Sequence, residues 1–508
     1  MIGRRDAIRL IGGGGLSLGL NACGFTPARP EPAGGRLRVA VAVSSTADTM
    51  DPARQTVVSD FCRCAMVYDG LTRLDARSRP QFALAEAIES QDSRDWSIRL
   101  RRGVRFHDGS PLTAADVVYS LNRHLDPAVG SKARIFAQQF ASVRADGPDH
   151  VRLVLESANS DLPTILGISQ FQIVRDGTRD FRHPVGTGPM RMVEFAPGVR
   201  SLAVRWPDYW RRKVRLGEIE LFSISDDSAR INALLSGDVD LIHAINPRIA
   251  HHLEHAGFDL LVTRSGGYTN LIARLDRGPT SHPDFVAGLK LLLDRETMRN
   301  AIFRGYATIG NDQPIAPTNP YFDPSVPQRA FDPDRARHHF ARAGMIGARL
   351  PIVTSTAADK SDDMAVLIQN AGRRAGVRFD IRRVPSDGYW TNSWMKVPLG
   401  FGNVNARPTA DIIFTQFFAS DAPWNESGWK NTRFDSLLRA ARGETDEARR
   451  KSLYGEMQHL VHDQAGIGIP LFLSSLDAHN PRVKGLRPMP QGGLMGFDFA
   501  ADAWMEGA

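Results

Sequence analysis

The sequence predicts an α/β protein built from two lobes, and three observations support this prediction. Short strands and helices alternate from residue 36 onward, which is typical of α/β architecture. "RLPIVTST" (349–356), "DDMAVLIQNAGRRAG" (362–376) and "VRFDIRRV" (377–384) read as one βαβ unit. The chain has 508 residues, enough for two or more domains. Around residues 265–280 the pattern of the sequence changes and Pro/Gly-rich loops begin.

The expected elements follow in chain order. An opening strand is expected at residues 36–43, and a helix is expected to begin after Ser59 or Asp60 as N-cap. Period-two alternation predicts strands at 96–100, 151–155 and 201–206. A helix over 228–237 takes Asp227 as N-cap and Gly237 as its stop, and residues 237–245 return to a strand. Residues 311–327 are expected to form a long Pro-rich loop.

The first residues read as an export signal. Arg4 and Arg5 resemble a twin-arginine signal, and the apolar run that follows them is too short to span a bilayer. Residues 20–23, "LNAC", resemble a lipobox in which Cys23 becomes the lipidated first residue, although Asn21 departs from the usual small or apolar residue. The alternative is ordinary cleavage and release. Residues 24–35 read as a flexible tether, so we expect a periplasmic protein, with or without a lipid anchor.

Composition, charge and cysteine usage exclude several classes. Hydrophobic residues make up 42% and charged residues 23%, which is ordinary globular composition. The net charge of +7 comes from scattered Arg with no nucleic-acid motif, so no nucleic-acid partner is expected. Cys62 and Cys64 lie two apart on a predicted helix and point to opposite sides, so they are expected to be buried free thiols. Two ligands alone do not make a zinc site.

"RGVRFHDGSPLTAADVVYSLNR" (102–123) places His107, Asp108 and Ser110 close together, which invites an enzyme interpretation. A nucleophilic Ser needs a base within reach and an orienting group behind it, and residues of one turn rarely achieve this. The same residues fit a turn that precedes a helix, with Thr113 as N-cap and Asp116 three residues on. We favour the structural interpretation.

Several long segments together resemble the family 5 extracellular solute-binding proteins, the peptide- and nickel-type binding components of ABC importers. They are residues 84–123, 186–210, 233–242, 286–298 and 424–472, in that order. The resemblance implies a two-lobed periplasmic-binding-protein fold of the cluster C type, with an extra subdomain in lobe I. We expect lobe I at 36–265 with the subdomain at about 57–180, lobe II at 266–472, and a return to lobe I at 473–508.

The resemblance also implies the function. A member of this family closes two lobes on a ligand by a hinge motion and delivers it to a membrane permease and ATPase. We therefore expect a monomeric peptide-binding component that is not an enzyme and needs no cofactor or metal. The same fold binding an opine, a sugar or a metal chelate remains open.

Physical chemistry suggests which side chains contact a peptide-like zwitterion. A carboxylate should face its ammonium, and an Arg should face its carboxylate. Within "FGNVNARPTAD" (401–411), Asp411 is the candidate for the ammonium and Arg407 for the carboxylate. Further candidates are aromatic walls, residues near the lobe crossing and a first cleft loop: Trp390, Trp394, Trp424, Tyr268, Asn270, Ser45, Thr46 and Met50. Residues 167–174 are another candidate cleft edge.

One alternative belongs to a different class of protein. "HHLEH" (251–255) contains His251, Glu254 and His255 in the pattern of an inverzincin metallopeptidase. The two His residues would share a helical face, as zinc ligation requires, and the Glu would act as general base. No third protein ligand is marked in the sequence, and a solvated surface helix is the favoured interpretation.

Overall fold

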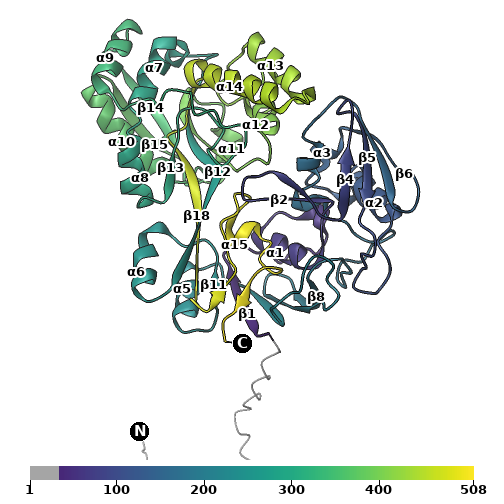
Figure 1. Ribbon diagram of the computed structural model, residues 1–508. Helices are drawn as coiled ribbons and strands as arrows, with labels where there is room; N and C mark the ends of the chain where they lie inside the picture. The colour runs from purple at the N-terminus through teal and green to yellow at the C-terminus, as the bar shows by residue number, and fades with distance from the viewer. Residues whose placement is uncertain (1–33, 508) are drawn as a thin grey trace, which may run out of the picture.

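The computed structural model describes residues 34–507 and consists of two α/β lobes with a smaller subdomain beside one of them (Figure 1). The predicted export signal, Cys23 and most of the predicted tether lie outside the described residues. Within residues 34–507, no helix combines the length and the apolar character needed to cross a membrane. The predicted α/β architecture in two lobes is confirmed.

One large mixed sheet joins the two lobes. Its strands lie in the order β16-β12-β18-β11-β1-β10-β9-β8, with β13 added on β18 and β17 on β12. β1 pairs in parallel with β10 and β11, and the other pairs are antiparallel. The strands are β1 (Arg36–Val41), β8 (Met190–Ala196), β9 (Arg200–Arg205), β10 (Glu218–Ser223), β11 (Leu241–Ile242), β12 (Asp259–Ala273), β13 (Ala307–Ile309), β16 (Leu399–Val404), β17 (Ile467–Gly468) and β18 (Leu471–His479).

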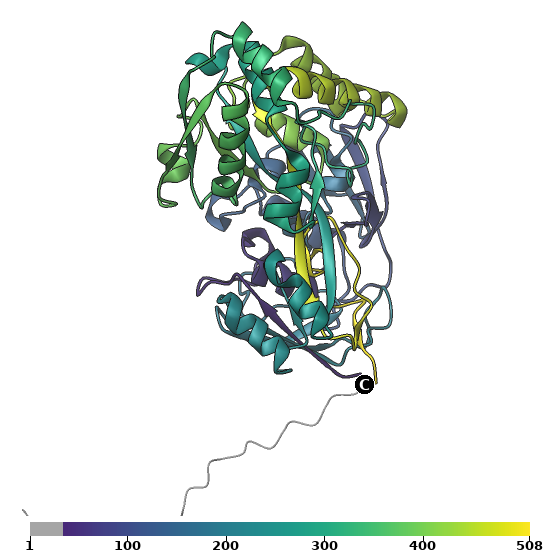
Figure 2. The same cartoon turned by 90° about the vertical axis from the view of Figure 1, so that its left-hand side faces the viewer.

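β12 and β18 run through the waist between the lobes, side by side in both views (Figures 1 and 2). The first half of β12, residues 259–264, pairs with residues 474–479 of β18, whereas its second half, residues 268–273, pairs with β16. The register shifts between Arg264 and Tyr268, where Gly266 and Gly267 lie. Such an irregularity bends and twists a strand locally, so the crossing is built as a hinge.

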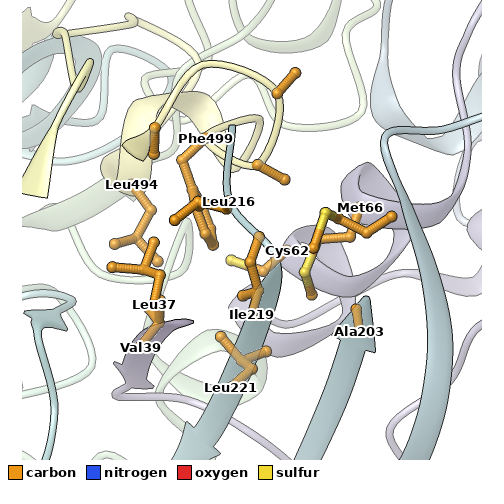
Figure 3. Close-up of a cluster of buried hydrophobic side chains, with 14 of the residues drawn as sticks. Leu37, Val39, Cys62, Met66, Ala203, Leu216, Ile219, Leu221, Leu494 and Phe499 are labelled. Carbon is orange, nitrogen blue, oxygen red and sulfur yellow. The ribbon is translucent and has the colours of Figure 1, made fainter. Parts of the chain in front are cut away.

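The lower lobe in Figure 1 buries its own hydrophobic core. Helix α1 (Val58–Val67) packs with β1, β10 and the C-terminal segment, so that Cys62, Met66, Leu221 and Phe499 lie in one cluster (Figure 3). Cys62 and Cys64 are buried free thiols, as predicted. The lobe is completed by α5 (Asp227–Leu235), α6 (Ala250–His255), β19 (Val483–Lys484), α15 (Gly493–Gly496) and β20 (Trp504–Met505).

A separate four-stranded sheet in the order β4-β5-β7-β6 forms the subdomain, with its own core. Its strands are β4 (Ala85–Glu89), β5 (Asp95–Leu100), β6 (Phe140–Ala145) and β7 (His150–Leu155), and its helices are α2 (Ala114–Asn122), α3 (Arg134–Ala137) and α4 (Leu162–Ile165). A hairpin of β2 (Thr72–Leu74) and β3 (Pro80–Phe82) precedes it. Helix α2 starts with the predicted capping box of Thr113 and Asp116.

The upper lobe contains the predicted βαβ unit, in which β14 (Arg349–Thr354) and β15 (Arg378–Arg383) pair in parallel around α10 (Ser361–Arg374). Most of the other helices lie in this lobe: α7 (Pro283–Leu291), α8 (Arg295–Phe303), α9 (Pro333–Arg342), α11 (Tyr389–Asn392), α12 (Ala410–Phe417), α13 (Thr432–Gly443) and α14 (Glu447–Gln464). Two hydrophobic clusters stabilise the lobe. No helix or strand lies between β13 and α9, which is the predicted Pro-rich loop.

Two local predictions were wrong by a residue or two at a helix start. Helix α1 begins at Val58, with Val57 at the N-cap position and no side-chain cap, rather than after Ser59 or Asp60. Helix α5 is capped by Asp226, whose side chain accepts a hydrogen bond from the backbone N–H of Ala229, and not by Asp227. At α5 two adjacent acids offer competing caps. At α1 the predicted caps bond elsewhere, since Ser59 Oγ donates to Asp48 and Asp60 accepts from the backbone N–H of Thr49.

Candidate ligand-binding crevice

A crevice lies beside the hinge and is lined from both lobes. Ser78 and Pro490 come from the side of the lower lobe, Gly266 from the hinge, and the other lining residues from the upper lobe: Pro314, Ile315, Ala316, Thr318, Asn319, Ala406, Arg407, Thr409 and Ile413. Its free volume is about 30 Å³. A small-molecule site needs ~300 Å³ or more, so the lobes are closed on little more than the space of a water molecule.

A larger groove of about 860 Å³ lies elsewhere, lined by residues between Asp51 and Phe181. All of its lining residues precede the hinge in the chain, so closing the lobes would not enclose a molecule bound there. Closing the lobes would instead enclose a molecule bound in the crevice, so the crevice is the candidate ligand site.

Arg407 is held in the crevice by the turn between β16 and α12. Thr409 caps α12 by accepting a hydrogen bond from the backbone N–H of Ile412. The Arg407 side chain donates to Gln416 Oε1 at 2.9 Å and to the backbone oxygen of Asn405 at 3.2 Å. Its guanidinium also lies over two aromatic rings, 5.6 Å from the centre of Phe417 and 6.0 Å from that of Trp424.

Arg407 is half-buried and has no acidic partner. Among the described residues, no carboxylate oxygen lies within 4.0 Å of its guanidinium, and both of its hydrogen bonds go to neutral oxygens. Burial lowers the pKa of Arg407, since desolvation disfavours the charged form. A partly buried cation without a counter-ion is costly in a folded protein, so an anionic group beside Arg407 would be stabilising.

A second polar cluster lies near Arg407, around the buried carboxyl group of Glu426. Asn270 Nδ2 donates to Glu426 Oε2 at 2.6 Å, and Trp394 Nε1 donates to Oε1 at 2.7 Å. Among residues 34–507, no cationic side chain forms an ion pair with this carboxyl group, and burial raises the pKa of Glu426 to about 7. Asn270 Oδ1 is buried without a hydrogen-bond partner. Tyr268 is 1% exposed, and burial raises its pKa, with Glu426 adding to that shift and Arg407 opposing it.

Gly402 makes room for this cluster. A Cβ atom at that position would lie 2.1 Å from Glu426 Oε1 and 2.8 Å from Asn270 Oδ1. Sequence reasoning missed Glu426, although a lone Glu in the segment "PWNESGW" (423–429), among aromatic and small residues, was a usable signal. The structure thus brings together Tyr268, Asn270 and Trp394 from the predicted set around a residue that was not predicted.

Asp411 lies on α12 but does not line the crevice. It is 5% exposed, and its Oδ1 accepts a hydrogen bond from Arg442 Nε at 3.0 Å. Burial raises the pKa of Asp411, and the Arg442 guanidinium opposes that shift. Because this carboxylate already has a cationic partner, we do not propose Asp411 as the contact for a ligand ammonium.

The other predicted aromatic residues differ in whether they lie beside Arg407. Trp424 is 39% exposed and forms part of the wall beside Arg407. Trp390, 41% exposed, stands edge-on to Trp394 with 5.5 Å between ring centres. Neither Trp390 nor Trp394 lines the crevice in the closed lobes.

The first predicted cleft loop is packed on its own lobe. Ser45 and Thr46 lie against Gly198 of the β8–β9 turn, and Ser45 N–H donates to Asp48 Oδ1 at 2.7 Å. Met50 is 1% exposed and belongs to the core of the lower lobe, so it does not face the crevice. Residues 167–174 do not line the crevice either.

The two enzyme-like motifs are structural. His251 Nδ1 and Glu254 Oε2 lie 2.9 Å apart on the exposed face of α6, and no group in residues 34–507 has three side chains that could hold a metal ion. In the other motif, Ser110 donates to Asp108 within the predicted turn, at 2.6 Å. His107 Nε2 lies 3.0 Å from the backbone oxygen of Gly188, and burial lowers the pKa of this His to about 4.

Two lobes, two connecting strands and a crevice between the lobes are the architecture of a ligand-binding protein. Residues 79–426 match the family described as "Bacterial extracellular solute-binding proteins, family 5 Middle", and the chain belongs to this family. It is therefore the substrate-binding component of an ABC importer and not an enzyme, as the resemblance implied.

Individual relatives are distant but span most of the chain. Heme-binding protein A of Haemophilus influenzae is 26% identical over 458 residues, covering 81% of this chain and 82% of the relative. Glutathione-binding protein GsiB of Escherichia coli (strain K12) is 24% identical over 480 residues, covering 90% and 93%. The structure of HbpA2 from Haemophilus parasuis superposes with a TM-score of 0.84 at 20% identity, covering 93% of this chain and all of that one, which confirms the fold.

Proposed function

We propose that this chain captures a small peptide or peptide-like solute in the crevice at the hinge and delivers it to a membrane permease. Arg407 binds a carboxylate of the ligand, and Phe417 and Trp424 form an apolar wall beside it. The observation that carries the proposal is the half-buried Arg407 without an acidic partner, in a space lined from both lobes. A carboxylate supplies the two parallel oxygens that a guanidinium binds best.

The glutathione-binding relative supports the peptide class, because glutathione is itself a small peptide with carboxylate groups. The small free volume of the crevice means that a ligand enters only after the lobes separate. Rotation at residues 264–268 of β12, where the register shifts, opens the crevice, and a bound ligand then stabilises the closed form.

A thermal-shift screen tests the proposal directly. The purified protein is mixed with di- and tripeptides, glutathione, opines, sugars and metal chelates, since a ligand that binds only the folded state raises Tm. A peptide is expected to give the largest shift, and Arg407→Gln is expected to reduce that shift strongly. Arg382→Gln, which changes an exposed Arg of the same lobe, is the matched control and should leave the shift unchanged. A sugar or chelate as the best ligand, with no peptide shift, would contradict the peptide assignment.

A second candidate ligand is a heme-like planar dicarboxylate. The pair of rings beside Arg407 would stack on a flat macrocycle while the guanidinium binds a propionate, and one relative is a heme-binding protein. Titration with hemin separates the two candidates: a saturable Soret change that Arg407→Gln weakens favours heme, and its absence favours the peptide.

Location, anchoring and lobe boundaries stay predictions. We include in the proposal export by the Arg4–Arg5 signal, lipid attachment at Cys23, a monomeric periplasmic protein and the lobe boundaries at 265/266 and 472/473. Mass spectrometry of the processed N-terminus in wild type and Cys23→Ala tests the lipid, and light scattering on the purified protein tests the monomer. Loss of export in Arg4→Lys/Arg5→Lys tests the signal.

A further inference from the structure

The charges around the crevice are unbalanced. Arg407 is the only ionisable side chain among the residues that line the crevice. The wall across from it is formed by Ser78, in the turn of the β2–β3 hairpin, and by Pro490. A zwitterionic ligand buried here would find a partner for its carboxylate and none for its ammonium.

Two acidic side chains of the upper lobe, Asp411 and Glu426, are already engaged. Asp411 forms an ion pair with Arg442 at 3.0 Å. Glu426 is 3% exposed and is covered by its hydrogen bonds to Asn270 and Trp394, so a ligand ammonium does not reach it without displacing them. Neither carboxylate is free to meet a ligand ammonium.

The hairpin across the crevice contributes Ser78 from its turn, and the acid of that turn is also engaged. Asp75 accepts hydrogen bonds from the backbone N–H groups of Arg77 and Arg79 at 2.8 and 2.9 Å, and from Gln81 Nε2 at 3.2 Å. Asp75 does not line the crevice. The residues that line the crevice therefore present one cation and no acid to a bound ligand.

We infer that the crevice selects net-anionic solutes, because a ligand carboxylate binds Arg407 and no acidic side chain lines the crevice to compensate a ligand ammonium. The inference deepens the proposed function and rests on the same site. Net negative charge, rather than a free peptide terminus, is then the property by which the protein distinguishes one solute from another. Desolvating an unpaired ammonium beside Arg407 is the physical basis of the discrimination.

Matched ligands that differ only in charge test the inference by calorimetric titration. One series is N-acetyl-Ala-Phe, Ala-Phe and Ala-Phe-amide, with net charges of about −1, 0 and +1 from ordinary pKa values. Glutathione against its diethyl ester and hemin against its dimethyl ester form two more pairs. We expect the more anionic member to bind at least tenfold more tightly, and Arg407→Gln to remove most of that difference. Arg407→Lys should retain part of it, and Arg382→Gln should retain all of it.

The outcomes separate this inference from the proposed function. Peptide binding that is equal for the acetylated, free and amidated forms would overturn the charge selectivity and leave the peptide proposal standing. Charge-dependent binding of hemin alone would support the selectivity and overturn the peptide assignment. If no anionic member of any series bound, both would be overturned.

Discussion

Replacing Asp161 by Asn is expected to separate the two lobes of the ligand-free protein. Asp161 precedes α4 of the subdomain, and its Oδ1 lies 2.7 Å from Arg450 Nη2 on α14 of the upper lobe. Each of the two side chains is 5% exposed, so the ion pair is buried between parts of the chain on opposite sides of the hinge. Ser160 strengthens the same contact by donating to the backbone oxygen of Glu444 at 2.8 Å.

The size of the effect follows from this burial. Removing one partner of a buried ion pair costs about 3–5 kcal/mol, because the other charge remains desolvated. When the lobes open, Arg450 regains water, so the cost falls on the closed form alone. About 3 kcal/mol corresponds to a shift of the closed-to-open ratio by roughly a hundredfold. The ion pair thus acts as a latch on the empty protein.

The assay is the distance between the lobes in solution, measured by small-angle scattering and by single-molecule fluorescence between labels on α5 and α9. Asp161→Asn should move the ligand-free distribution toward long distances, and a bound ligand should move it back. Glu456→Gln is the matched control, since it breaks the exposed Arg433–Glu456 pair within the upper lobe. If Asp161→Asn and the control gave the same distance distribution as wild type, the latch would be refuted.

Three further predictions concern stability in urea. Glu426→Gln should raise the free energy of unfolding by about 3 kcal/mol at pH 8 and leave it unchanged at pH 4. Burial raises the pKa of Glu426 from 4.5 to about 7, so the wild-type protein loses stability as the pH rises from 4.5 to 7, and the variant does not. Asn270 should flip to pair its free oxygen with the new amide. Lys290→Met should stabilise by a few kcal/mol below pH 7 and by nothing near pH 10.5, because burial lowers the pKa of Lys290 from 10.5 to about 7. A uniform effect across pH would contradict either assignment. Gly402→Ala should destabilise by about 1–3 kcal/mol through the clash with Glu426, and an unchanged urea midpoint would contradict that contact.

Local patterns predicted local structure well, because they depend on neighbours in the chain. The capping box of Thr113 and Asp116 and the βαβ unit around α10 both depend on residues within one or two elements, and both were predicted from the sequence. The helix starts that were wrong have different causes: adjacent acids compete to cap α5, whereas the predicted caps of α1 bond to Asp48 and Thr49, outside the helix.

The polar pairs of the site could not be predicted in the same way. Asn270 and Glu426 are 156 residues apart, and nothing local to either residue marks the other as its partner. Asp411 looked like a free ligand contact, since its partner Arg442 lies on the following helix and meets it only through the packing of α12 on α13. Met50 looked like a loop residue and is instead part of the core, because its loop folds back onto the lower lobe. The sequence nominated Arg407 by residue type, and that ligand role stays a prediction, while the tertiary structure shows that Asp411 and Glu426 are already engaged.

Helix α12 lies between the crevice and the subdomain. Arg407, three residues before the helix begins, lines the crevice, while Ile412, 6% exposed, packs into the hydrophobic core of the subdomain. Asp411 on the same helix is held by Arg442, whose backbone oxygen accepts a hydrogen bond from Ser160 of the subdomain at 2.9 Å. If a ligand carboxylate binds Arg407 as proposed, it acts three residues before the helix that docks on the subdomain. We therefore expect ligand binding and lobe closure to be coupled through α12.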